Sequence, residues 1–236
     1  MEKNIIIFTD GASSGNPGPG GWGTIVSYNG RVTELGGGEE KTTNNRMELQ
    51  AVLEGLLFVI DQSLTSHPIT LYTDSSYVAN GITTWIKGWQ SRNWTNKMGD
   101  PIANIDIWKK IAEALKEVHL KIINISGHSG IPGNERADKI ATSHVKDDAN
   151  YYMYDGSEME YDVDLTHVRI DPEQKKEKDR KKGKAYSYLS LVNGILQIHY
   201  TWNECKQRVE GQKGVKYKKA ISKEDENTIK RSWGIK

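Results

Sequence analysis

The chain has 236 residues and a formal net charge of +1 at pH 7, with 36% hydrophobic and 27% charged residues. This composition is typical of a globular protein with one large domain or two smaller ones. No apolar run approaches the roughly 18 residues that a membrane span needs, and the apolar run near the N-terminus is too short for a signal peptide. The one cysteine, Cys205, excludes an intrachain disulfide. We therefore expect a cytoplasmic protein that does not enter a membrane.

Charge divides the sequence into three blocks. Residues 1–146 are nearly neutral, residues 147–174 carry one arginine and nine acidic residues, and residues 175–236 carry 17 basic and seven acidic residues. We expect a first domain over 1–146, an acidic segment followed by a charged linker over 147–184, and a second domain over 185–236. A basic piece attached to a neutral body favours a polyanionic partner.

Hydrophobic periodicity predicts that the first domain is α/β. A β-branched run indicates a buried strand near the N-terminus, and two further strands flank Asn29-Gly30, a strong hairpin signal. Amphipathic helices follow, and we expect Asn44 or Asn45 to cap the first and Asn134 the last. This order indicates a mixed sheet with helices on its faces. The expected elements are strands at 5–8, 22–28 and 31–35, a helix at 49–60, a strand at 69–73, a helix at 107–118, a strand at 120–125 and a helix at 137–144.

Beyond residue 146 the pattern weakens. Residues 147–172 have no steady period, although some alternation leaves room for an added strand, and 175–184 is a charge run expected to be a solvated linker. A second Asn-Gly pair, Asn193-Gly194, predicts another hairpin in a small α+β domain of about 50 residues. The expected elements are strands at 186–192 and 195–200 and short helices at 205–209 and 225–229.

Four acidic residues are placed to meet at one edge of the first sheet. Asp10 and Asp74 follow predicted strands, where open α/β sheets bind ligands, and Glu48 and Asp138 border the apolar stripes of predicted helices. Clustered carboxylates repel one another unless a cation neutralises them. Oxygen-only ligands select Mg²⁺ or Mn²⁺ over zinc. Several carboxylates suit two ions roughly 3.5–4 Å apart, which stabilise the attacking and leaving oxygens of phosphoryl transfer.

His128 lies in a glycine-rich loop just before the helix of Asp138. An imidazole in that place could shuttle a proton near pH 7. Each of these residues alone also has an ordinary interpretation. An aspartate after a strand forms turns, a glutamate in a first helical turn favours the helix dipole, and a histidine in a glycine loop is usually solvated. Spacing alone leaves both interpretations open.

The motifs around these residues resemble those of the type-1 ribonuclease H family. The resemblance rests on Asp10-Gly11 with SGNPG at 14–18 and GGWG at 20–23, on TNNRMEL around Glu48, on YTDS with Tyr77-Val78 around Asp74, and on GHSG with GNE at 133–135 and Ala137-Asp138. Ser76 departs from the pattern, because some members carry a glutamine there. It covers residues 4–146 in order, with every charged catalytic position filled. It implies a ribonuclease H-like mixed five-stranded sheet flanked by helices. It also implies an endoribonuclease that hydrolyses the RNA strand of RNA–DNA hybrids and leaves a 5′-phosphate and a 3′-hydroxyl.

The resemblance also implies a role for each site residue. Asp10, Glu48, Asp74 and Asp138 would hold two Mg²⁺ ions, with Mn²⁺ as a substitute, and His128 would assist proton transfer or product release. The family distinguishes RNA from DNA by the 2′-hydroxyls in the minor groove. The implied hybrid contacts are Gly11, Ala12, Ser13, Asn44 and Asn45 near the RNA strand, Lys41, Thr43 and Asn104 at a DNA phosphate, Asn16 at another polar position, and Trp85 on a deoxyribose. For Trp89 and Trp94, core packing is an equal alternative.

The second domain resembles the small hybrid-binding, or viroplasmin-like, module found with some type-1 enzymes. The resemblance rests on TWNEC at 201–205, VEG at 209–211 and the YKK that begins at Tyr217. This module usually precedes the catalytic domain, whereas here it follows. It implies that Trp202 and Tyr217 stack on sugars while Lys218 and Lys219 meet phosphates. The alternative is a basic interaction tail with Trp202 in its core.

Three functions remain as hypotheses. The first is a Mg²⁺-dependent, hybrid-specific endoribonuclease, which we expect to be a monomer with an appended binding module. The second is a nucleic-acid-binding protein with an inert ribonuclease-like domain, and the third is a related metal nuclease that acts on DNA. The filled acidic positions argue against the second, and the Asn44-Asn45 pair with the Gly-His loop favours RNA over DNA. The acidic segment 147–174 could be a sheet extension, a spacer, or a mimic that competes for the basic module.

Overall fold

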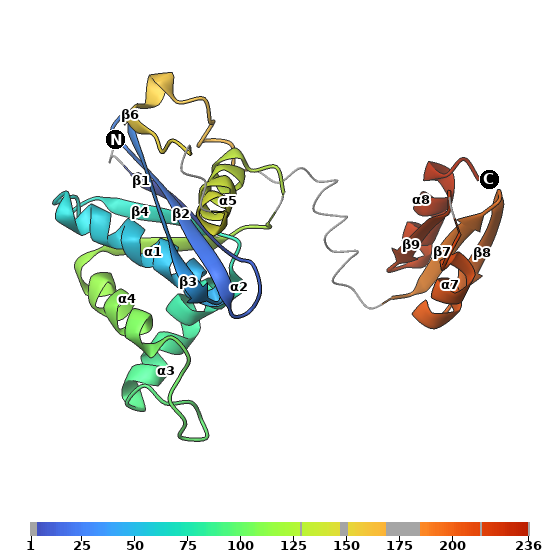
Figure 1. Ribbon diagram of the computed structural model, residues 1–236, viewed down its shortest axis with the longest axis horizontal. Coiled ribbons are helices and arrows are strands. Elements are labelled where there is room, and N and C mark those ends of the chain that lie inside the picture. Colours follow the sequence, from blue (N-terminus) through green and yellow to red (C-terminus); the bar gives the residue numbers. More distant parts are fainter. Residues whose placement is uncertain (1–3, 128, 147–150, 169–184, 213, 236) are drawn as a thin grey trace. The chain divides into compact units, whose positions relative to one another are not determined.

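The computed structural model describes residues 4–127, 129–146, 151–168, 185–212 and 214–235. The chain divides into two compact units, Met1–Ile170 and Asp171–Lys236, both drawn in Figure 1. Each unit has its own sheet and its own hydrophobic core. Within the described ranges, no helix has both the length and the apolar character needed to span a bilayer.

The first unit is built on a mixed sheet of six strands in the order β5-β4-β1-β2-β3-β6. β1, β2 and β3 form an antiparallel meander, while β4 and β5 run parallel to β1. The predicted turn at Asn29-Gly30 is confirmed, and both residues have the positive φ that a tight hairpin requires. The strands are β1 (Ile5–Ser13), β2 (Gly18–Tyr28), β3 (Arg31–Thr42), β4 (Pro68–Thr73), β5 (His119–Asn124) and β6 (Asp155–Ser157).

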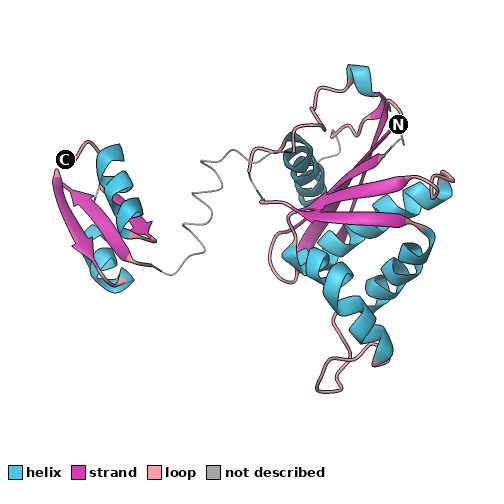
Figure 2. Ribbon diagram, turned by 180° about the vertical axis from the view of Figure 1, so that it is seen from behind, coloured by secondary structure: helices cyan, strands magenta, loops and turns pink. Residues whose placement is uncertain are grey.

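Helices cover both faces of this sheet (Figures 1 and 2). Ile7 of β1 joins the core beneath α1 and α4, and the next residue, Phe8, joins the core beneath α5. Because β1 is buried on both faces, its sequence is a continuous apolar run instead of an alternation. The helices are α1 (Asn44–Asp61), α2 (Ser76–Asn80), the π-helical turn η1 (Gly81–Trp85), α3 (Ile86–Ser91), α4 (Ile105–Glu117) and α5 (Pro132–Val145).

The predicted helix caps were wrong in both cases. Thr43 caps α1, because its backbone is extended and its hydroxyl accepts a hydrogen bond from the amide of Arg46. Asn44 and Asn45 are the first two helical residues. In α5, Pro132 occupies the first helical position, for which its fixed φ and missing N–H are suited, so the helix begins before Asn134. Asn134 is therefore free to serve the site described below.

The acidic segment contributes a sixth strand, so the sheet has one strand more than the five that the resemblance implied. We call the described residues 151–168 the strap. Within it, β6 pairs antiparallel with β3, and Arg31 and Asp155 form an ion pair of 2.9 Å across the two strands. A short 3₁₀ turn, η2 (Glu158–Glu160), follows. Leu165 is 3% exposed and packs in the core beneath α5. Of the three interpretations left open for this segment, the sheet extension is confirmed.

The second unit is a three-stranded antiparallel sheet in the order β8-β7-β9 with two helices. The predicted hairpin is confirmed, with its turn at Asn193-Gly194. A capping box begins the first helix, since Thr201 and Glu204 each accept a backbone hydrogen bond from the other. Both short helices were predicted, although each is longer than expected. The elements are β7 (Ser187–Val192), β8 (Ile195–His199), α7 (Trp202–Val209), β9 (Lys216–Ala220) and α8 (Lys223–Ser232).

The burial of Leu165 predicts that the strap contributes to the stability of the first domain. We expect Leu165→Ala to lower the free energy of unfolding by about 2–5 kcal/mol, the range for truncating a buried leucine. Urea denaturation followed by far-UV circular dichroism measures this loss. Tyr152→Ala is the control within the strap, because Tyr152 is 76% exposed, and it should change stability by less than about 0.5 kcal/mol. Equal losses for both variants would contradict the packing of Leu165.

Candidate active site

The adjacent parallel strands β1 and β4 bring Asp10 and Asp74 together. β1 and β4 pair in register from Ile5 and Ile69 to Thr9 and Thr73, so the residues that follow this pairing, Asp10 and Asp74, are neighbours. Asp10 lies within β1, which continues to Ser13 against β2, whereas Asp74 comes directly after the end of β4. The sequence placed both residues after strands, and the pairing of β1 with β4 makes them neighbours. This edge is the place where open α/β sheets bind ligands.

Helix α1 brings Glu48 to the same point. Glu48 is 5% exposed and Asp10 is 7% exposed. Carboxylate oxygens of Asp10, Glu48 and Asp74 all lie within 4.8 Å of one another. Asp138, on α5, is not within that close group, but it lines the same pocket, whose volume is about 300 Å³. The lining residues are Asp10, Gly11, Ala12, Ser13, Asn44, Glu48, Asp74 and Asp138.

Hydrogen bonds orient these carboxylates. The amide of Gly11 donates to Oδ1 of Asp10 at 2.8 Å. The side-chain amide of Asn44 donates to Oε1 of Glu48 at 3.3 Å, and that of Asn134 donates to Oδ2 of Asp74 at 3.4 Å. Oε2 of Glu48 is buried and has no hydrogen-bond partner among the described residues. A buried carboxylate oxygen without a donor is unfavourable unless a cation meets it.

The electrostatics of the cluster also require positive charge. Burial, followed by repulsion from Asp74 and Asp138, raises the pKa of Asp10 from 3.8 to about 8. Burial and the charge of Asp10 raise the pKa of Glu48 well above its usual value. A divalent cation removes both penalties, and oxygen-only donors suit hard cations. The residues present therefore fit a divalent metal site.

The loop before α5 packs directly against Asp74. A Cβ atom added at Gly127 would lie 2.1 Å from Oδ2 of Asp74, so this close approach requires glycine. His128, the next residue, lies outside the described residues, and its proposed proton transfer stays a prediction. Asn134 is 2% exposed and reaches Asp74 from the other end of the loop. Gly127 and Asn134 thus hold the acid from both sides.

Asn134 was missed as a site residue because its sequence position looked like a helix cap. A signal was available in its spacing from Asp138. Residues four apart share one face of a helix, so Asn134 and Asp138 both face the carboxylates once α5 begins at Pro132. Gly127 was quoted only as part of a motif, and its closeness to Asp74 could not be read from spacing.

The predicted hybrid contacts are distributed around this pocket. Gly11, Ala12, Ser13 and Asn44 line it. Asn16, Lys41 and Asn45 are exposed, and Thr43 and Asn104 are half-buried. Thr43 and Asn104 also precede α1 and α4, and Asn104 adopts a left-handed conformation with φ of 57°. Their contact with a DNA phosphate stays a prediction.

Trp85 differs from Trp89 and Trp94 in its exposure, as the sequence suggested. Trp89 and Trp94 are partly buried against the main core, which agrees with the packing alternative. Trp85 is 36% exposed, and its ring lies 5.6 Å from that of Trp89. An open hollow beside α3 is lined by Thr84, Trp85, Gly88, Trp89, Arg92, Asn96 and Lys97. Trp85 is therefore the tryptophan of this group that is available for stacking.

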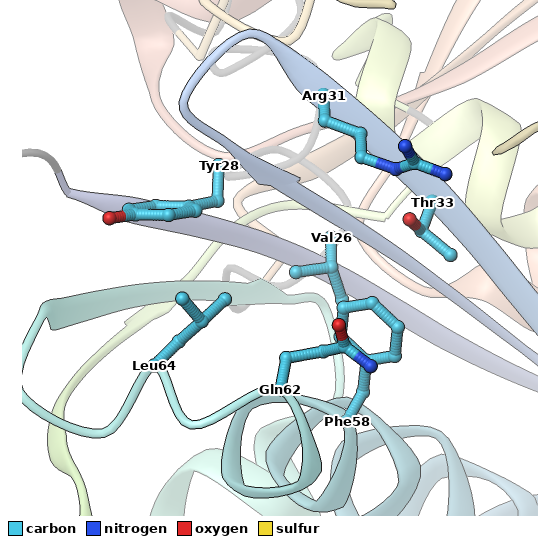
Figure 3. Close-up of a pocket in the computed structure, with 7 residues that line it drawn as sticks. All are labelled: Val26, Tyr28, Arg31, Thr33, Phe58, Gln62 and Leu64. Carbon is cyan, nitrogen blue, oxygen red and sulfur yellow. The ribbon is translucent and has the colours of Figure 1, made fainter. Parts of the chain in front are cut away.

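A second pocket lies at the opposite end of α1 (Figure 3). Phe58 at this pocket and Glu48 at the carboxylates are ten residues apart on one helix, or about 15 Å at 1.5 Å per residue. Its one charged lining residue, Arg31, is already paired with Asp155. This pocket therefore contributes nothing to the carboxylate site. Its volume is about 190 Å³, and it is lined by Val26, Tyr28, Arg31, Thr33, Phe58, Gln62 and Leu64.

An aromatic and basic surface occurs in the second unit. The ring of Trp202 on α7 lies 5.7 Å from the rings of Tyr188 and Tyr217. Trp202 is 42% exposed and Tyr217 is 53% exposed, so both retain accessible faces. Lys218 and Lys219 follow Tyr217 on β9. Trp202 is therefore not a core residue, which disfavours the alternative of a basic tail packed around it.

Carboxylates gathered where the parallel pairing of two strands of a mixed sheet ends are typical of a metal-dependent enzyme of phosphoryl transfer. The family profile described as RNase H matches residues 2–146, more than half of the sequence, and the chain therefore belongs to the ribonuclease H family. It is accordingly an endoribonuclease that degrades the RNA strand of RNA–DNA hybrids.

Individual relatives agree with this assignment. The chain is 46% identical over 143 residues to a ribonuclease H of Alcanivorax borkumensis, covering 61% of this chain and 92% of that protein. It is 48% identical over 138 residues to a ribonuclease H of Gluconobacter oxydans, covering 58% and 89%. The crystal structure of LC9-RNase H1, a type 1 RNase H with the type 2 active-site motif, matches with a TM-score of 0.58 at 26% identity over 73% of this chain and 88% of that chain.

The second unit has a match of its own. A profile described as Ribonuclease H1 N-terminal domain matches residues 196–225, which include most of β8, all of α7 and β9, and the start of α8. The resemblance of the second unit to the hybrid-binding module is thereby confirmed. Its position after the catalytic domain differs from the N-terminal place in the profile's description.

The raised pKa of Asp10 predicts that Asp10→Asn stabilises the metal-free protein. Between about pH 4 and pH 8 the folded protein retains a proton that the unfolded chain releases, so stability falls as pH rises through this window. Asparagine at position 10 does not titrate, so Asp10→Asn removes this dependence of stability on pH. We expect a gain of at least about 2 kcal/mol at pH 8, because each unit by which the pKa is raised corresponds to about 1.4 kcal/mol, and a smaller gain at pH 5.

Thermal denaturation in EDTA at both pH values measures this difference. Added Mg²⁺ should stabilise the native chain and have little effect on Asp10→Asn. If Asp10→Asn is less stable than the native chain at pH 8 without metal, the repulsion between Asp10 and the neighbouring carboxylates is refuted.

Proposed function

We propose that Asp10, Glu48, Asp74 and Asp138 hold two Mg²⁺ ions and thereby carry the hydrolysis of the RNA strand. The products would be a 5′-phosphate and a 3′-hydroxyl. The observation that carries this proposal is the close group of Asp10, Glu48 and Asp74, two of them buried and with raised pKa values. Mn²⁺, which also prefers oxygen ligands, is the expected substitute.

Each residue has a distinct task in this proposal. The bound ions would activate the attacking water and neutralise the charge that develops on the leaving oxygen. Asn134 and Gly127 keep Asp74 aimed into the pocket, and Asn44 orients Glu48. His128 would take up or deliver a proton near pH 7.

Discrimination between RNA and DNA is proposed to come from residues beside the carboxylates. Gly11, Ala12 and Ser13 line the pocket with β1 backbone, and Asn44 adds a side-chain amide. These groups can donate to and accept from a 2′-hydroxyl, the feature that separates RNA from DNA at a given site. Asn45 is exposed next to Asn44. The DNA strand would meet Trp85 and the polar residues Lys41, Thr43 and Asn104, with Asn16 as a further contact.

The second unit is proposed to bind the same hybrid. Trp202 and Tyr217 would stack on sugars, and Lys218 and Lys219 would neutralise phosphates. A linked binding module raises the local concentration of substrate at the catalytic domain without adding contacts to the active site. This arrangement accounts for the basic charge of residues 175–236 beside the nearly neutral first domain.

The cleavage assay compares labelled RNA–DNA hybrid, duplex RNA and duplex DNA with Mg²⁺. We expect cuts only in the RNA of the hybrid, and complete loss in EDTA and in Asp10→Asn, because both remove the metal site. Gln50→Ala is the control on α1, since Gln50 bonds Glu54 and not the cluster. Cleavage of duplex DNA would favour the DNA nuclease, and binding without any cleavage would favour the inert binding protein.

The binding role of the second unit is tested with the cleavage-deficient Asp10→Asn chain in EDTA. Adding Trp202→Ala should weaken hybrid binding by about 1–3 kcal/mol, the range for a lost stacking contact. Adding Lys219→Ala should flatten the dependence of log K on log salt by about 0.9 if one phosphate contact is lost. Lys116→Ala is the charge-matched control, since Lys116 lies on α4 and pairs with Glu113. Affinities unchanged by both Trp202→Ala and Lys219→Ala would refute the binding role.

A further inference from the structure

The strap connects the helix that carries Asp138 to the edge of the sheet. It follows α5 in the chain, pairs with β3 through β6, and packs Leu165 beneath α5. It lies beyond residue 146, where the family match ends. The strap therefore lies outside the residues that the family profile matches, and it contacts α5 through Leu165.

Glu34 of β3 is the point where the strap, the sheet and α5 meet. Its side chain is fully buried, and Arg136 of α5 donates to it from Nε at 2.6 Å and from Nη2 at 2.8 Å. From the strap, the hydroxyl of Tyr161 donates to Oε1 at 2.5 Å and the amide of Tyr154 donates to Oε2 at 2.9 Å. Both carboxylate oxygens thus accept one bond from α5 and one from the strap.

Aromatic rings of the strap enclose the same ion pair. The guanidinium carbon of Arg136 lies 5.1 Å from the ring centre of Tyr151, a cation–π contact. The ring of Tyr161 packs against that of Tyr154 at 4.9 Å. Buried charge pairs with complete hydrogen bonding have little freedom to move. Arg136 is therefore held in one position by groups that the strap supplies.

Holding Arg136 controls the rotation of α5. Arg136 and Asp138 are two residues apart, which places their side chains about 200° apart around a helix with 3.6 residues per turn. A Cβ atom added at Gly23 would lie 2.4 Å from the carbonyl oxygen of Ala137, so the backbone of α5 lies directly on β2. Side chains of α5 pack on the same face, since Ile140 is fully buried and would meet a Cβ atom added at Gly23 or Gly36. The pair between Arg136 and Glu34 adds a polar constraint to this packing.

Asp138 is the acid whose position depends on this constraint. The other three acids come from β1, the end of β4 and the start of α1, and they form the close group. Asp138 alone comes from α5 and lies outside that group while lining the same pocket. A rotation of α5 would move Asp138 relative to the other three ligands.

We propose that Tyr161 is a positioning residue for metal binding, which acts through Glu34 and Arg136 to hold Asp138 at the site. This inference rests on the proposed function, because it assigns Asp138 to a metal ion. It predicts that removing one hydroxyl, outside the residues that the family profile matches, weakens metal binding while leaving hybrid binding intact.

The test compares Tyr161→Phe with Tyr154→Phe in the full-length chain. The hydroxyl of Tyr154 donates to the carbonyl of Ser157 within the strap and does not touch Glu34, so this control removes the same atom from the same segment. We measure Mn²⁺ binding directly by isothermal titration calorimetry, the Mg²⁺ concentration for half-maximal cleavage, and KM for the hybrid at saturating Mg²⁺.

For Tyr161→Phe we expect Mn²⁺ affinity to fall and the Mg²⁺ midpoint to rise by at least about threefold, below the 10–100-fold typical when a group bonded to a ligand is removed. KM for the hybrid should stay within twofold, and Tyr154→Phe should match the native chain in all three measurements. Glu34→Gln, which keeps the shape of the side chain, should shift the metal measurements in the same direction and by more.

Two results would overturn the proposal. One is unchanged Mn²⁺ affinity in folded Tyr161→Phe, even if its melting temperature falls, because the role of Tyr161 would then be structural. The other is a shift of equal size in Tyr154→Phe. If Tyr161→Phe does not fold, unchanged metal binding in Glu34→Gln overturns the proposal in the same way. Failure of the proposed function can be told apart from failure of this inference, because in the first case the native chain itself would not cleave the hybrid with Mg²⁺.

Discussion

Mutual repulsion among buried carboxylates is the constraint on which the rest of the structure depends. Asp10 and Glu48 are held almost out of water, beside Asp74, at a cost that appears as raised pKa values. A fold retains such a cluster only if the surrounding structure holds the carboxylates in place and a cation offsets the repulsion between them. The parallel pairing of β1 and β4, the start of α1 and the loop at Gly127 supply that fixation. The same repulsion favours the binding of divalent metal at this site.

The two faces of the sheet contribute differently to this arrangement. On one face, α1 and α4 form the larger core, and α1 delivers Glu48 as an integral part of it. On the other face, α5 lies against the backbone of β2 and delivers Asp138. The strap then covers the start of the edge strand β3, where β6 pairs with Arg31–Thr33. An element that covers an edge can thus also govern the geometry of a distant ligand.

The proposed function assigns binding of the hybrid to the second unit and the chemistry to the first. Residues 1–146 are nearly neutral overall and hold the carboxylates of the pocket, whereas the second unit presents aromatic rings and lysines. Attraction to a polyanion is therefore strongest away from the carboxylates, which would by themselves repel phosphates. Cations in the pocket reverse that local repulsion. This division explains why one chain carries both an acidic centre and a basic module.

The sequence by itself determined the class of fold, both hairpins, the four acids and the resemblance to ribonuclease H, because these follow from local periodicity, Asn-Gly turns and contiguous motifs. It also indicated the aromatic and basic residues of the second unit. Only the tertiary structure decided that Thr43 caps α1, that Asn134 faces Asp74, and that residues 155–157 add a sixth strand. The contacts of Glu34 with Arg136 and Tyr161 join residues more than 100 positions apart in the chain. No local pattern reports such a contact, because burial and strand register, which bring these residues together, are properties of the folded chain.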